Sequence, residues 1–143
     1  ISIYCAEFLV GEMFQKFNWS LYLVLAEQLL KDALLYPQPK TDNKIDEAYY
    51  RSAISRAYYA AFCVTKNYLE EHHITIPRKE SHIFVANELK NNRNTRKIAA
   101  VFISLRDYRN IADYDDKTPS GLANIAKQST RNSQLIIDLI NKL

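Results

Sequence analysis

The stretch that decides the fold is DEAYYRSAISRAYYAAFCVTKNYLEE, residues 46–71. It contains no glycine or proline, and its apolar residues recur every three or four positions, as in a helix with one buried face. The predicted inward residues are Tyr50, Ile54, Ala57, Tyr58, Ala61, Phe62, Thr65 and Leu69. Asp46 is a suitable N-cap. A helix of this length extends for about 39 Å, so we expect it to be the central element of the domain.

Helical periodicity also marks the sequence before this stretch. Asn18 is a suitable N-cap for a helix that ends at PQPKTDNK (37–44), because proline removes a backbone donor and restricts the preceding residue. The predicted inward residues of this helix are Tyr22, Leu25, Ala26, Leu29, Leu30 and Ala33.

Three more helices are predicted after the central stretch. The first runs from Ser81 to Leu89, the second opens at Thr95, and Ser120 caps the last. Inward positions of the last two are Ile98, Val101, Phe102, Leu105, Tyr108, Ala112, Leu122, Ile125, Ala126, Ile136, Leu139, Ile140 and Leu143. No segment keeps the two-residue alternation of a half-buried strand. The sequence therefore predicts an all-α, up-and-down bundle of four or five helices.

Composition limits the class of protein. With 143 residues, 48% of them hydrophobic, the chain is expected to form one domain, a bundle over 17–143 preceded by an N-terminal extension over 1–16. Met13 is a candidate natural start, which would make 1–12 an upstream addition. No run approaches the ~18 uninterrupted apolar residues of a membrane span, and none is expected.

Charge and cysteine usage give weaker indications. Residues 78–109 hold eight Lys or Arg and three Asp or Glu, a local charge of +5, which suits either an anionic partner or a solvated helix face. The two cysteines, Cys5 and Cys63, have no metal-ligand spacing and are too few for a disulfide scaffold. We expect a cytoplasmic protein with no metal and no cofactor.

The segment RDYRNIADYDD (106–116) is unusually polar for a helix without glycine or proline. Arg106, Arg109 and Asp113 share one helical stripe, and Asn110 lies beside it. One interpretation is a solvent-exposed salt-bridged face, which contributes little to stability. The other is a guanidinium group held by a carboxylate and offered to a phosphate.

Three motifs in order resemble the HEPN superfamily, in particular its small prokaryotic members: RSAISRAYYAAF (51–62), SH (81–82) and LRDYRNIADYDD (105–116). The resemblance implies a helical bundle that pairs as a homodimer, with the two Arg109 side chains facing a shared cleft. It also implies an RNA-cleaving toxin or defence component, with RNA or a nucleotide as ligand. A nucleotidyltransferase-type antitoxin is the implied protein partner.

The catalytic signature of that family is only partly present. It consists of an arginine, a polar residue and then a histidine after a spacing of four to six residues; Arg109 and Asn110 match the first two. The histidine would fall at Tyr114, Asp115 or Asp116, and none is a histidine. Tyrosine is a weak base at neutral pH, so Asp113 or Asp115 is the alternative proton acceptor. Weak or absent RNA cleavage is therefore expected, since one general acid or base contributes about 10²–10⁴-fold in rate.

Other residues join the predicted site with alternatives left open. Arg56 either supports Asp113 or lines the phosphate cleft together with Arg106, Arg109 and Asn110. Tyr58 is either a core tyrosine or a supporting residue. His82 is either a structural residue at a helix start or a substitute for the missing histidine. In some relatives a tyrosine near the catalytic segment accepts a nucleotidyl group from the antitoxin, and Tyr114 stands at a related place.

Three functions remain in view. The leading one is an RNA- or nucleotide-binding HEPN protein of a toxin–antitoxin or defence system, with a groove around Arg109. The second is an active, metal-independent ribonuclease that uses Asp113, Tyr114 or His82. The third is a non-catalytic module that docks a nucleotidyltransferase-like partner.

Overall fold

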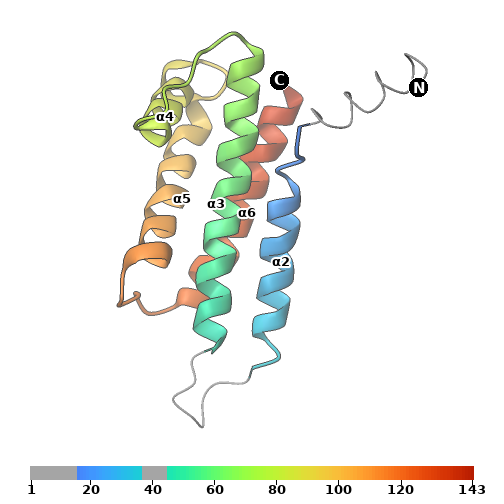
Figure 1. Ribbon diagram of the computed structural model, residues 1–143, viewed down its shortest axis with the longest axis vertical. Coiled ribbons are helices and arrows are strands. Elements are labelled where there is room, and N and C mark those ends of the chain that lie inside the picture. The colour runs from blue at the N-terminus through green and yellow to red at the C-terminus, as the bar shows by residue number, and fades with distance from the viewer. Residues whose placement is uncertain (1–15, 37–44) are drawn as a thin grey trace, which may run out of the picture.

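The computed structural model describes residues 16–36 and 45–143. Within them the elements are α2 (Leu21–Ala33), α3 (Ile45–Glu71), α4 (Ser81–Asn91), α5 (Arg96–Tyr114) and α6 (Leu122–Lys142). No strand occurs in this part of the chain. Figure 1 shows α2, α3, α5 and α6 running alternately down and up, with α4 beside the start of α5. The predicted all-α bundle is confirmed. The predicted PQPKTDNK break (37–44) lies outside the described residues.

Helix α3 is the central element because small residues line one side of it. Ala53 and Ala57 lie against Ala26 of α2, and Ala60 lies against Leu23 of α2 and Ile137 of α6. Side chains without bulk let neighbouring helices approach closely. Helix α3 consequently contacts each of α2, α4, α5 and α6.

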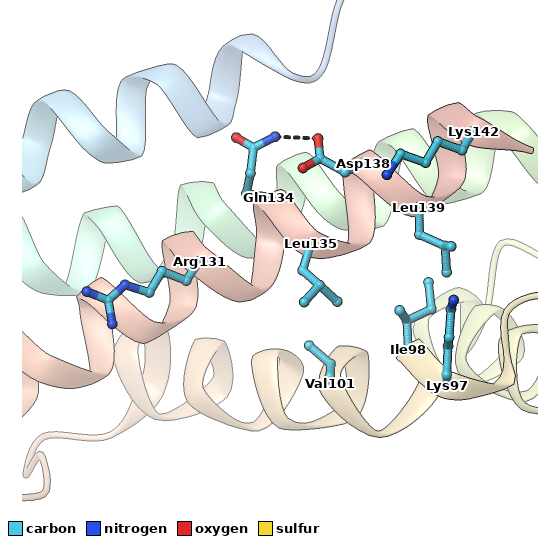
Figure 2. A pocket seen from close by; sticks show the side chains of 9 residues that line it. All are labelled: Lys97, Ile98, Val101, Arg131, Gln134, Leu135, Asp138, Leu139 and Lys142. Carbon is cyan, nitrogen blue, oxygen red and sulfur yellow. Dashed lines mark hydrogen bonds between the residues drawn. The ribbon is translucent and has the colours of Figure 1, made fainter.

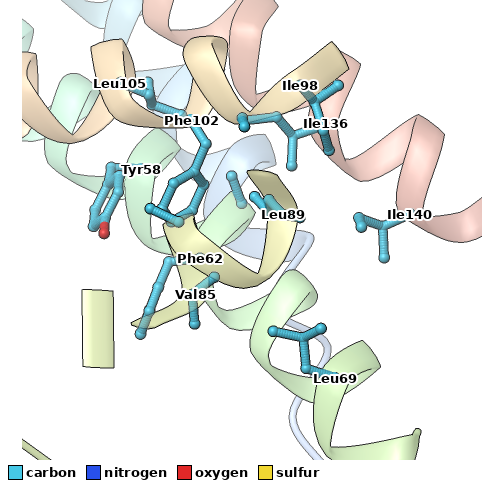
Figure 3. Packing of buried hydrophobic residues seen from close by; sticks show 13 residues of the cluster. Tyr58, Phe62, Leu69, Val85, Leu89, Ile98, Phe102, Leu105, Ile136 and Ile140 are labelled. Carbon is cyan, nitrogen blue, oxygen red and sulfur yellow. The ribbon is translucent and has the colours of Figure 1, made fainter. Parts of the chain in front are cut away.

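The largest part of the core joins α3, α4, α5 and α6 on the other side of α3. Figure 3 shows its principal members, which are Tyr58, Phe62, Leu69, Val85, Leu89, Ile98, Phe102, Leu105, Ile136 and Ile140. Large side chains from α3, α4, α5 and α6 pack against one another in this part of the core. The prediction of burial is wrong for two residues. Leu25 of α2 is 44% exposed, and Leu143, after the end of α6, is 47% exposed.

The helix ends differ from the predicted caps. Asn18 accepts a hydrogen bond from the backbone of Ser20 one turn before α2. Thr95 stands at the N-cap position of α5, as predicted, but its hydroxyl donates to the Leu89 carbonyl and makes no cap hydrogen bond. The N-cap of α6 is Gly121, with φ of +77°, and not Ser120. Glycine fits this left-handed conformation because it has no Cβ. The five helices of the described residues agree with the predicted four or five, but the predicted cap side chains of α2, α5 and α6 do not make the expected cap hydrogen bonds.

Candidate functional site

Arg109 is buried in the bundle and not on a solvated face. It is 5% exposed, and the Cζ of its guanidinium lies 5.0 Å from the ring centre of Tyr58, 5.5 Å from that of Tyr59 and 5.8 Å from that of Tyr114. Aromatic faces attract a cation at these distances. Its position explains the burial, because residue 109 continues the inward stripe of Phe102 and Leu105. The solvent-exposed salt bridge is thereby excluded.

The charge of Arg109 is only partly compensated by its neighbours. Its Nη1 lies 3.9 Å from Oδ2 of Asp113 and donates a long hydrogen bond of 3.5 Å to the Tyr114 hydroxyl. The Ser55 hydroxyl donates to the same Asp113 oxygen at 3.2 Å. A buried charge normally needs close pairing to offset its desolvation. The site therefore keeps an excess of positive charge.

Two buried donors in this region lack any partner within the described residues. They are Nε of Arg109 and Nε of Arg106, which lie one helical turn apart on α5. Leaving a buried donor unsatisfied costs about 1–3 kcal/mol, and more when the group is charged. Both guanidinium groups therefore have unused capacity for an acceptor, and an anion would satisfy it best.

His82 joins this cluster through Tyr58. The hydroxyl of the fully buried Tyr58 is hydrogen-bonded to Nδ1 of His82, and the His82 ring stacks on Phe62 at 4.2 Å between centres. The pKa of His82 is lowered to about 4, first by burial and then by the positive charges of Arg109 and Arg106. Burial has the opposite effect on Tyr58, whose pKa it raises above the ordinary value, because the charged form of tyrosine is the deprotonated one. At neutral pH the imidazole is therefore uncharged, and Tyr58 is both a core residue and a contact of the site.

Arg56 does not support Asp113; Ser55 and Arg109 do. The Arg56 guanidinium lies 4.9 Å from the ring centre of Tyr22 on α2 and 5.7 Å from that of Tyr59. It is partly exposed, and none of the ion pairs within residues 16–36 and 45–143 includes it. Arg56 thus lies next to Arg109, with Tyr59 between the two.

The remaining predicted residues lie at the rim. Arg106 and Asn110 are half-buried on α5, and Tyr114, the last residue of that helix, is 73% exposed. Asp115 is the C-cap of α5, and its backbone carbonyl, not its carboxylate, binds Arg51. The tertiary structure therefore brings Arg109, Asp113, Tyr114, Tyr58 and His82 together and leaves Asp115 at the edge.

Arg51 holds the end of α5 in place, a role that the sequence did not reveal. Its guanidinium donates to the carbonyls of Ala112 (3.2 Å), Asp115 (2.6 Å) and Asp116 (3.2 Å), and it pairs with Glu47 at 3.2 Å. The last carbonyls of a helix lack intrahelical partners, so a cation there is stabilising. The four-residue spacing of Glu47 and Arg51 predicts an ion pair within α3. No local pattern in the sequence predicts that Arg51 also contacts the end of α5.

No group of three or more His, Cys, Asp or Glu side chains in the described part of the chain is arranged to hold a metal ion. Among the same residues, no helix is both long enough and apolar enough for a membrane span. The arrangement is instead one of guanidinium, aromatic and imidazole groups, which bind anions and unsaturated rings.

Comparison with known proteins identifies a family for the chain. Residues 26–143 match the family model for the HEPN domain, which covers both the long motif helix α3 and the polar end of α5. The curated proteins and the solved structures gave no match to the chain. On the strength of the family match, which extends over most of its length, this chain belongs to the HEPN domain family.

Proposed function

We propose that this HEPN protein binds RNA by gripping backbone phosphate with Arg109 and Arg106, as a component of a toxin–antitoxin or defence system. The observation that carries the proposal is the pair of buried Nε donors without a protein acceptor among the described residues. A phosphate supplies several acceptor oxygens and a negative charge, and a guanidinium binds it with two parallel hydrogen bonds.

Access to the site depends on Tyr114. Its ring lies against the Arg109 guanidinium, yet most of the side chain is exposed, so it can rotate away with little loss of packing. Arg106, Arg56 and Tyr59 are already partly exposed. A phosphate would therefore reach the guanidinium groups from the side of the bundle that these residues share.

The test is binding of a labelled single-stranded RNA, measured by fluorescence anisotropy over a series of salt concentrations. Arg109→Ala should weaken binding about tenfold or more and lower the slope of log K against log salt by roughly 0.7 for each phosphate that is no longer bound. Arg109→Lys should restore only part of the affinity, because an ammonium group lacks the bidentate geometry. Asp113→Asn should have a smaller effect than Arg109→Ala, since it only loosens the placement of the arginine.

Arg131 provides the matched control. It is exposed on α6 and takes part in none of the ion pairs or ring contacts of the described residues, so Arg131→Ala removes the same charge without removing a contact of Arg109. Circular dichroism verifies that each variant is folded. If Arg109→Ala keeps the wild-type affinity and salt slope, the phosphate site is wrong, and docking of a nucleotidyltransferase-like partner becomes the better account.

A second candidate, RNA cleavage, is favoured by one specific observation: Tyr58 holds His82 beside Arg109. In this reaction the ribose 2′-oxygen attacks the adjacent phosphorus and the bond from phosphorus to the 5′-oxygen breaks. The products are a 2′,3′-cyclic phosphate and a 5′-hydroxyl. A neutral His82 would take the 2′-hydroxyl proton, and water would protonate the leaving oxygen.

Cleavage is measured with end-labelled RNA in the presence of EDTA. His82→Asn should abolish cleavage while RNA binding stays near the wild-type level. Intact RNA after prolonged incubation with the wild-type protein would reject the ribonuclease and leave binding alone.

A further inference from the structure

A row of alternating tyrosine and arginine side chains crosses three helices. In spatial order it consists of Tyr22 of α2, Arg56 and Tyr59 of α3, and Arg109 and Tyr114 of α5. Each guanidinium Cζ lies between 4.9 and 5.8 Å from the centres of its two neighbouring rings in the row. Figure 1 shows α3 between α2 and α5, which do not touch each other, so the row passes over α3.

Four of the five side chains of the row are open to a ligand, and the fifth, Arg109, is 5% exposed and lies beside the exposed Tyr114 ring. Tyr22, Arg56 and Tyr59 are half-buried, and Tyr114 is largely exposed, so parts of their rings and of the guanidinium remain open to solvent. In the described residues the only carboxylate paired with either arginine is Asp113, at 3.9 Å from Arg109. The row therefore presents aromatic surface and nearly uncompensated positive charge in alternation.

This alternation suits a ligand in which rings and phosphates also alternate. Unpaired bases stack on aromatic side chains and on guanidinium planes, while basic side chains bind the backbone. In a duplex the bases are stacked on one another and are not free to do this. We infer that the row is the path of a single RNA strand, with unpaired bases stacked at the tyrosine rings and phosphates at the two guanidinium groups.

This inference rests on the proposed phosphate site at Arg109 and adds the class of RNA and its direction across α3. The experiment compares one labelled oligonucleotide, single-stranded or annealed to its complement, against full-length variants. Wild-type protein should prefer the single strand. Tyr114→Ala should weaken single-strand binding by about fivefold or more and leave duplex binding unchanged, because it removes a stacking surface but no charge.

Further variants test separately the stacking of bases on the aromatic rings and the binding of phosphate by the guanidinium group. Tyr114→Trp should retain single-strand binding, since it keeps an aromatic face. Arg56→Ala should reduce single-strand affinity and the salt slope, and Arg56→Lys should recover the slope but not the full affinity. Tyr36 serves as the matched control, because it is an exposed tyrosine that stacks on Tyr49 and lies outside the row. Tyr36→Ala should bind as wild type.

The outcomes separate the row from the phosphate site. If Arg109→Ala loses RNA binding while Tyr114→Ala and Arg56→Ala bind as wild type, the phosphate site stands and the row is overturned. Equal affinity of the wild type for single strand and duplex also overturns it. If Arg109→Ala binds as wild type, the proposed function itself fails, and the row fails with it.

The surface also has a hollow whose lining contains none of the residues of the row. Figure 2 shows a groove of about 750 Å³ between α5 and α6, with Ile98, Val101, Leu135 and Leu139 along its floor. Its charged rim contains Lys97, Arg131 and Lys142 but also Asp138, which accepts a hydrogen bond from Gln134 at 2.8 Å. Nothing in the described residues shows what covers this groove.

Discussion

The hydroxyl of Tyr58 on α3 is hydrogen-bonded to Nδ1 of His82 at the start of α4, a contact between residues 24 positions apart. It places a neutral imidazole within the field of Arg109 and Arg106. The pair joins the core of the bundle to the candidate site, since Tyr58 also lies under the Arg109 guanidinium.

This environment of His82 predicts a pH dependence of stability. The pKa of His82 is about 4 in the folded protein and about 6.5 in an unfolded chain, so between these values the unfolded state binds more protons. The free energy of unfolding should therefore fall as the pH falls from about 6.5 towards 4. Because His82 is partly exposed, we expect roughly 1 kcal/mol and not the full effect of the shift.

The measurement is urea denaturation of the wild type and of His82→Asn at about pH 7 and about pH 5. Asparagine keeps an acceptor for the Tyr58 hydroxyl but does not titrate. The groups that face His82 are Tyr58 and Tyr59 from α3 and the two arginines of α5. Equal losses of stability in the two proteins would contradict the assignment.

The contacts of Arg51 predict a cost in stability when it is removed. Arg51→Ala deletes three hydrogen bonds to carbonyls at the end of α5 together with the pair to Glu47. We expect about 2 kcal/mol of destabilisation, seen as a melting temperature lower by roughly 4–8 °C. Arg131→Ala, on the exposed side of α6, should melt as wild type. A normal melting temperature for Arg51→Ala would show that α5 ends correctly without it.

Assembly is the third prediction. The α2 residues Leu21, Val24 and Leu25 are large, apolar and exposed, and Ile103 of α5 is exposed as well, so the lone bundle leaves apolar surface uncovered. We expect an isologous homodimer whose two Arg109 sites share one cleft. Light scattering should give twice the mass of the chain, and Tyr114→Cys should cross-link on oxidation more than the wild type. A strict monomer at tens of micromolar would contradict this.

Modification of Tyr114 is the fourth prediction. Its hydroxyl is on an exposed side chain and lies 3.5 Å from Nη1 of Arg109, so a phosphate attached there would contact the guanidinium. When the protein is coexpressed with a nucleotidyltransferase encoded beside it, that enzyme should transfer a nucleotidyl group from a nucleoside triphosphate to this oxygen. Pyrophosphate and the phenolic proton are released. Intact-mass analysis should show the adduct in the wild type and not in Tyr114→Phe. The modified protein should bind RNA weakly; an unmodified wild-type mass removes the hypothesis.

The sequence by itself determined the helices and their order. The period of the apolar residues and the polar breaks between them are local properties, and they predicted α3, α4 and α5 to within a few residues. The burial of Arg109 could also be predicted from the sequence, because position 109 lies on the same face of the helix as Phe102, Leu105 and Ala112. The charge of the Arg109 side chain favours an exposed position, whereas its place in the helix favours a buried one. The side chain is buried because aromatic rings cover its guanidinium.

Only the tertiary structure decided which side chains meet between helices. Arg56 lies over Tyr22, Arg51 binds the end of α5, and Tyr58 binds His82, and none of these contacts follows from spacing along the chain. Such pairs depend on how far each helix is shifted and rotated against α3. Those offsets are set by the fit of whole helix surfaces, with small alanines of α3 packed against α2 and α6 and large residues packed against α4, α5 and α6.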